Sequence, residues 1–77
     1  MATTRAVQTA ELYRTIMGEP ISAIVMNPID VTDEVRKEIE EYGPGIELME
    51  STMVASGQGY ILNLAQIDAE MGLLFDA

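Results

Sequence analysis

The sequence has no cysteine, no histidine and no tryptophan. Without cysteine the chain cannot form a disulfide scaffold, and without cysteine and histidine it lacks the ligands of the zinc sites that stabilise many small domains. The missing histidine also excludes a serine or cysteine nucleophile activated by imidazole, and an imidazole proton switch near neutral pH. We therefore expect no enzyme activity and no catalytic residues.

Recognisable loops for metals and phosphates are absent as well. The segment from Asp30 to Asp33 has neither the acid spacing nor the glycine of a calcium loop. The pair Gly57 and Gly59 lacks the third glycine of a dinucleotide fingerprint, because Leu62 stands in its place. We expect no cofactor and no metal site, and we interpret these glycines as turns.

Positive charge is scarce. The chain has 4 Lys and Arg against 13 Asp and Glu, which gives a formal net charge of −9. A protein that neutralises phosphates needs a basic patch, so direct binding to nucleic acid is not expected. A basic protein surface is the kind of partner that this charge favours.

Long apolar runs are missing too. No stretch approaches the ~18–20 residues of a membrane span, and the first residues lead into no apolar signal-peptide core. We expect no membrane partner and a cytoplasmic location, in the cell of origin or in an infected host. The length predicts a single small acidic domain over residues 1–77.

A chain of 77 residues can bury only a small core, and cores of this size rarely contribute more than ~3–5 kcal/mol without a disulfide, a metal or a partner subunit. We therefore expect a homo-oligomer. The residues expected at its interface are Leu73, Leu74 and Phe75, because they are large, apolar and close to the end of the sequence.

Two segments are typical of helices. In residues 4–17 apolar side chains recur at helical spacing, Thr3 or Thr4 can cap the start, and Gly18 suits a left-handed C-terminal position. In residues 32–42 Thr32 is a good N-cap, acids occupy the first turn, and apolar side chains recur every three to four residues.

The remaining segments are ambiguous between helix and strand. Residues 21–26 suit either a buried strand or a short helix, whereas good helix formers at helical spacing favour helices over 46–56 and 60–75. The expected fold class is mainly α, a small bundle of four to five short helices. The alternative is an α+β fold in which 52–56 and 60–64 form a hairpin.

The acids gather in the middle of the sequence. Those expected to contact a partner are Asp33, Glu34, Glu38, Glu40, Glu41, Glu47 and Glu50. Glu34, Glu38 and Glu41 share one helix face, where the like-charged neighbours Glu34 and Glu38 cost a few tenths of a kcal/mol. The competing interpretation is a solvated helix face that only keeps the protein in solution.

These features favour a small acidic protein-binding module. It would act as an inhibitor by occupying a basic surface, such as one that binds nucleic acid, which the row of acids mimics. In composition alone the chain resembles phage or mobile-element accessory proteins that inhibit host machinery. The alternatives are a homo-oligomeric structural or assembly subunit and an oligomeric protein that sequesters a ligand.

Overall fold

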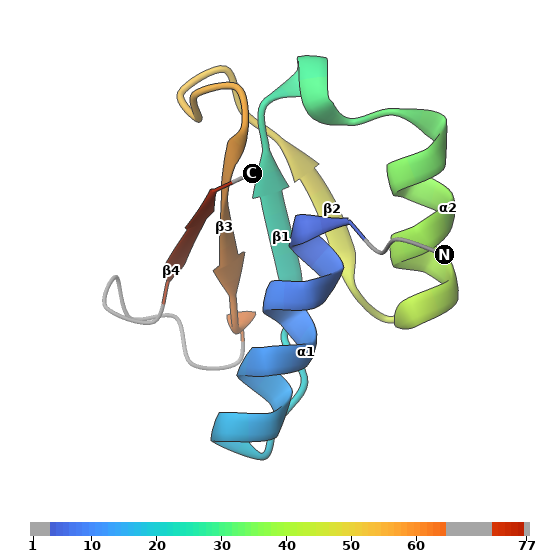
Figure 1. Cartoon of the computed structure of the whole chain (residues 1–77), viewed down its shortest axis with the longest axis vertical. Coiled ribbons are helices and arrows are strands. Elements are labelled where there is room, and N and C mark those ends of the chain that lie inside the picture. Colours follow the sequence, from blue (N-terminus) through green and yellow to red (C-terminus); the bar gives the residue numbers. More distant parts are fainter. Residues whose placement is uncertain (1–3, 65–71, 77) are drawn as a thin grey trace.

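The computed structural model describes residues 4–64 and 72–76 and forms an α+β fold (Figure 1). Two helices and a four-stranded mixed sheet make up the described chain. In chain order the elements are α1 (Arg5–Met17), β1 (Ala23–Met26), the 3-10 turn η1 (Pro28–Asp30), α2 (Asp33–Tyr42), β2 (Glu47–Glu50), β3 (Gln58–Leu62) and β4 (Leu73–Asp76). None of the helices in the described ranges has the length and apolar character that a membrane crossing requires.

Both helices expected from the sequence are present, with the expected caps. The hydroxyl of Thr4 accepts a hydrogen bond from the backbone N–H of Val7 at the start of α1. At its end Gly18 adopts a left-handed conformation with φ 74°, and its N–H donates to the carbonyl of Arg14. Such local signals act within one turn, so they determine the helix ends independently of the rest of the fold.

Helix α2 is equally well defined by its own residues. The hydroxyl of Thr32 accepts a 3.2 Å hydrogen bond from the N–H of Val35. Asp33 and Glu34 lie in the first turn, where the helix dipole stabilises negative charge. Ile39 is buried in the core of the protein, so the acids of α2 lie on the other sides of the helix.

The sheet has the strand order β2-β1-β3-β4. Strand β1 pairs with β2 in parallel and with β3 in antiparallel orientation, and β3 pairs with β4 in antiparallel orientation. The parallel pair is connected through α2, as expected for strands that cannot be joined by a tight turn. Strands β2 and β4 are therefore the two edges of the sheet.

The expected fold class, a mainly α bundle of four to five short helices, is wrong. Residues 46–56 contain strand β2, residues 60–75 contain parts of β3 and β4, and residues 21–26 contain β1. The hairpin of the alternative prediction is wrong too, because residues 52–56 form turns and β3 pairs with β1 and β4. The part of the expected last helix that covers residues 65–71 lies outside the described residues.

Tertiary pairing overrides the helix propensity of residues 46–56. An isolated helix of about ten residues is marginal in water, whereas as a strand this segment satisfies the backbone groups of β1 along four paired residues. The segment that follows is held in turns by the side chain of Asp30 in η1. The carboxylate of Asp30 accepts hydrogen bonds from the N–H of Gly57 at 2.8 Å and from the hydroxyl of Ser56 at 3.2 Å.

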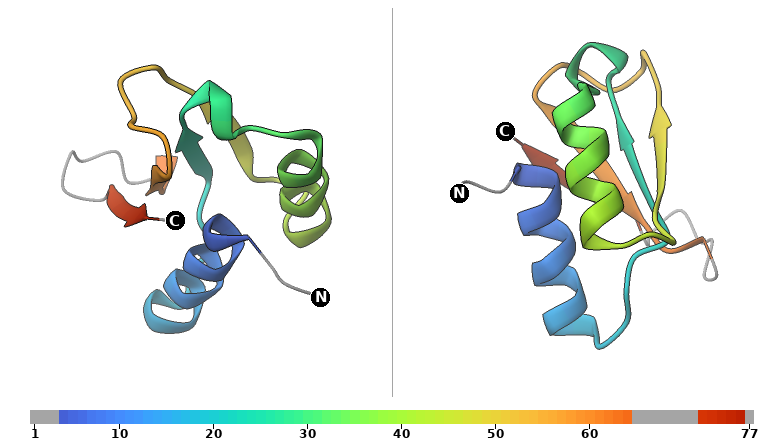
Figure 2. Two further views of the ribbon diagram at one scale, coloured as in Figure 1. Left: turned by 45° about the horizontal axis from the view of Figure 1, so that its top comes forward. Right: turned by 90° about the vertical axis from the view of Figure 1, so that its right-hand side faces the viewer.

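Both helices cover the same face of the sheet (Figure 2). Side chains of paired residues point to one side of a sheet, so the register places Ile24, Ile61 and Phe75 together on the covered face. All three belong to one buried cluster that also includes Tyr13 of α1 and Ile39 of α2. The core of the protein is therefore a single layer between the helices and one face of the sheet.

Candidate acidic site

The acids expected from the sequence gather on α2 and β2, at one edge of the molecule (Figure 1). Residues 33–50 carry seven acidic side chains and two basic ones, a net charge of −5. The exposed acids that carry no side-chain ion pair in the described structure are Asp33, Glu34, Glu40, Glu41 and Glu47. We call the acids of α2 and β2 the acidic edge.

The acidic edge is held together by one ion pair. The guanidinium of Arg36 on α2 lies 2.8 Å from the carboxylate of Glu50 on β2, and both side chains are about half exposed. A surface pair of this kind contributes roughly 0–1 kcal/mol to stability. Its larger effect here is on charge. Residues 33–50 contain two basic residues, and because Arg36 is paired with Glu50, Lys37 is the other positive charge among the acids.

Glu38 has a structural role that the sequence did not reveal. Its side chain is half-buried, and one carboxylate oxygen accepts a 2.7 Å hydrogen bond from the backbone N–H of Thr4. This bond connects α2 to the residue that caps α1. Glu38 is therefore not equivalent to Glu34 and Glu41, the two exposed acids on the same side of α2.

Replacing Glu38 with Ala is expected to lower the free energy of unfolding by about 1–2 kcal/mol, because it removes a charge-assisted hydrogen bond between the helices. The matched variant Glu34→Ala is expected to change it by less than about 0.5 kcal/mol, as for most surface substitutions. Urea titrations of both variants measure the difference. Equal losses would show that the Thr4 contact contributes nothing.

The three residues expected at an oligomer interface occupy different places. Phe75 is buried in the core of its own chain, with 7% of its surface exposed. Leu73 points to the covered face of the sheet and Leu74 to the opposite face, and both remain about half exposed. Of the three, Leu74 is the one that lies on the side of the sheet opposite the helices.

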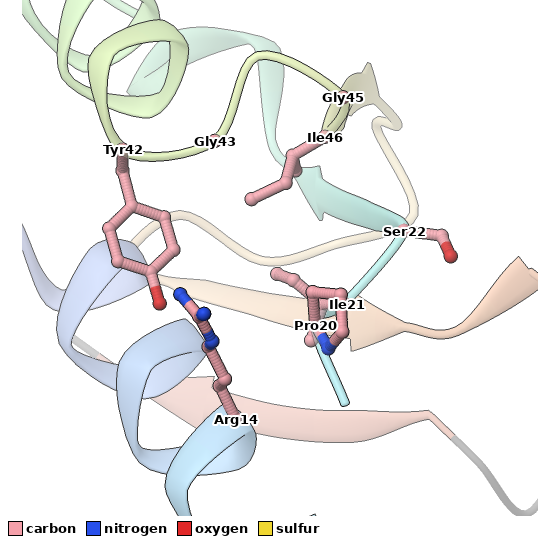
Figure 3. Close-up of a pocket in the computed structure, with 8 residues that line it drawn as sticks. All are labelled: Arg14, Pro20, Ile21, Ser22, Tyr42, Gly43, Gly45 and Ile46. Carbon is pink, nitrogen blue, oxygen red and sulfur yellow. The ribbon is translucent and has the colours of Figure 1, made fainter. Parts of the chain in front are cut away.

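A pocket that the sequence did not indicate lies between the C-terminal ends of the two helices and the start of the parallel strands (Figure 3). Its volume is about 370 Å³. The guanidinium of Arg14 points toward the hydroxyl of Tyr42 across the opening, and Ile21 and Ile46 form apolar walls. The lining residues come from both helices and from the loops that follow them, so only the folded chain brings them together.

No group of three or more acidic side chains in residues 4–64 and 72–76 is placed to hold a metal ion. The exposed acids of α2 are spread along the helix, and Glu38 is half-buried and bonded to Thr4, so these carboxylates do not converge on one point. Searches of family models, curated proteins and solved structures found no match to this chain.

Proposed function

We propose that this protein is a small protein-binding module whose acidic edge docks on a basic surface of a partner protein. The observation that supports the proposal is the gathering of five exposed acids on α2 and β2, with only Lys37 as an unneutralised cation among them. A rigid helix and an edge strand present these charges together, so complementary potential can steer the encounter and select the partner.

The arrangement of the charges on α2 and β2 supports a partner that binds nucleic acid. Acids that project from a helix and an adjacent strand form an extended negative array, and such an array resembles the phosphates that a nucleic-acid-binding protein contacts. We infer inhibition by occlusion, in which the acidic edge occupies the basic surface and excludes the nucleic acid. The inhibitor would act in the cytoplasm, in the cell of origin or in an infected host.

The test compares two variants of equal net charge. In the edge variant Glu34 and Glu41 are replaced with Gln, which retains helix propensity. In the control variant Glu11→Gln and Asp76→Asn remove two exposed acids away from the edge. Glu38 stays unchanged in both, because its hydrogen bond to Thr4 contributes to the fold.

The probe is a histone-like DNA-binding protein with a labelled DNA duplex bound to it. The wild-type chain is expected to displace the duplex, and the edge variant is expected to associate at least about threefold more slowly at low salt, because rim charges act mainly on the association rate. The control variant should associate at the wild-type rate. Equal slowing of both variants would mean that only net charge matters and would reject the acidic edge as the binding surface.

The homo-oligomeric alternative is favoured by a different observation. The face of the sheet opposite the helices carries apolar side chains that are partly exposed, among them Met49, Tyr60 and Leu74. This surface adjoins the acidic edge, because Met49 and Glu47 project to the same face of β2.

A further inference from the structure

The pocket between the C-terminal ends of the two helices has no part in the docking of the acidic edge. Its volume of about 370 Å³ lies within the range of roughly 300–1,000 Å³ that small-molecule sites occupy. Arg14 and Tyr42 lie on opposite sides of its opening, and Ile21 and Ile46 line it beside them (Figure 3). The pocket therefore combines a polar mouth with apolar walls, as ligand sites do.

The two polar groups at the mouth of the pocket are free to bind. Within residues 4–64 and 72–76, no ion pair or hydrogen bond involves the guanidinium of Arg14 or the hydroxyl of Tyr42. The two groups point toward each other (Figure 3). A guanidinium can only donate hydrogen bonds, and a phenolic hydroxyl can donate one. A hydrogen-bond acceptor held between Arg14 and Tyr42 would therefore satisfy both.

Arg14 differs from the other basic residues in its surroundings. The chain has four Lys and Arg residues in total. Arg36 is engaged in an ion pair, and Lys37 lies on α2 among the acids. The side chain of Arg5 donates a hydrogen bond to the backbone carbonyl of Asp76. Arg14, by contrast, is unpaired within the described residues and lines a pocket, so it is available to an anionic ligand.

We infer that this pocket binds a small monocarboxylate with an apolar body. The carboxylate accepts two hydrogen bonds from Arg14, whose planar fork matches its two oxygens, and one from the hydroxyl of Tyr42. The apolar body lies against Ile21 and Ile46. An apolar cavity of about 150 Å³ holds benzene, so the pocket has room for an aromatic ring or a branched aliphatic group beside the carboxylate.

The charge around the pocket favours a ligand with a single negative charge. The chain carries a net charge of −9, and the C-terminal ends of α1 and α2, which border the pocket, carry the partial negative charge of the helix dipole. Arg14 matches one carboxylate. A phosphate group, with close to two negative charges, would have one cation to meet and would be repelled by the rest of the protein. The apolar walls then supply the affinity that further charges would supply elsewhere.

A titration with phenylacetate, followed by the backbone amide shifts in NMR spectra, tests the inference. Phenylacetate joins one carboxylate to one ring, and a ligand this small is expected to bind with a dissociation constant of roughly 0.1–1 mM. The largest shifts are expected at Ser22, Gly43 and Gly45, which line the pocket. Phenylacetamide lacks the charge and acetate lacks the ring, so each should bind at least about tenfold more weakly.

Two variants of equal net charge identify the residue that holds the carboxylate. Arg14→Gln is expected to raise the dissociation constant of phenylacetate at least about tenfold, because it removes hydrogen bonds to a charged group. The control Lys37→Gln removes another exposed cation on a helix and should change the constant by less than about twofold. Tyr42→Phe retains the ring and should raise the constant roughly threefold to tenfold. Circular dichroism confirms that each variant is folded.

Three results would overturn the inference. The first is the absence of shifts at the pocket amides up to about 10 mM phenylacetate. The second is equal binding of phenylacetate and phenylacetamide, and the third is an equal loss of binding in Arg14→Gln and Lys37→Gln. The proposed function is tested separately, because Arg14→Gln removes no acid and should dock on a basic partner at least as fast as the wild type.

Discussion

Replacing Ile61 with Ala is expected to unfold a large fraction of the protein at 25 °C. Ile61 lies in β3 between β1 and β4, and its side chain is completely buried against the helices. Removing three carbon atoms from such a site leaves a cavity and costs about 2–5 kcal/mol. The whole stability of a core this small is roughly 3–5 kcal/mol, so little or none remains.

Urea titration at a fixed, dilute protein concentration measures the loss, since any self-association would otherwise add to the stability. The conservative variant Ile61→Val should cost only about 0.5–1.5 kcal/mol. The control Leu62→Ala removes a partly buried side chain from the face of the same strand that lies opposite the helices. If Ile61→Ala and Leu62→Ala lowered stability equally, the assignment of the covered face would be wrong.

The helices could be predicted from the sequence because their signals are local. Thr4 and Thr32 cap the two helices within one turn, and Gly18 ends the first in a conformation that glycine adopts readily. Apolar residues at helical spacing then face the core in both helices. None of these signals depends on where the rest of the chain lies.

The strands could not be predicted, because what stabilises them is remote in the sequence. Residues 23–26 pair in parallel with residues 47–50 and in antiparallel orientation with residues 59–62. Strands this short carry little periodicity of their own, and apolar residues on both faces remove the alternation that would distinguish a strand from a helix. The good helix formers of residues 46–56 then favoured the wrong structure.

For the acidic site too, the sequence predicts the features that are local and misses those that depend on remote residues. The position of the acids along α2 follows from the helix, which the sequence predicts. The separate role of Glu38 does not, because its hydrogen-bond partner Thr4 is 34 residues away. The pairing of Arg36 with Glu50 also depends on β2 being a strand, and the sequence favours a helix for that segment.

Replacing Phe75 with Ala is expected to lower the free energy of unfolding by about 3–5 kcal/mol. The ring is buried in the core, and it occupies the space that a side chain at Gly59 on the neighbouring strand would fill. The loss should detach β4 from β3 and shift the urea midpoint to near zero. The neighbouring change Leu74→Ala, on the face of the sheet opposite the helices, should cost only about 1 kcal/mol in dilute solution, because that side chain is 55% exposed.

A double-mutant cycle tests whether the ring and the glycine form one packing unit. A Cβ at residue 59 would lie within 3.0 Å of two ring atoms of Phe75 and 2.9 Å from the carbonyl oxygen of Val25, so Gly59→Ala is expected to cost about 1–3 kcal/mol by overpacking. In a Phe75→Leu background the ring clash is gone, and the same change should cost at least about 0.5 kcal/mol less, an interaction energy typical of residues in contact. Urea titrations of the two single variants and the double variant give the interaction energy. Additive losses would mean that the Val25 carbonyl alone excludes a side chain at residue 59, and that Phe75 packs independently of the glycine.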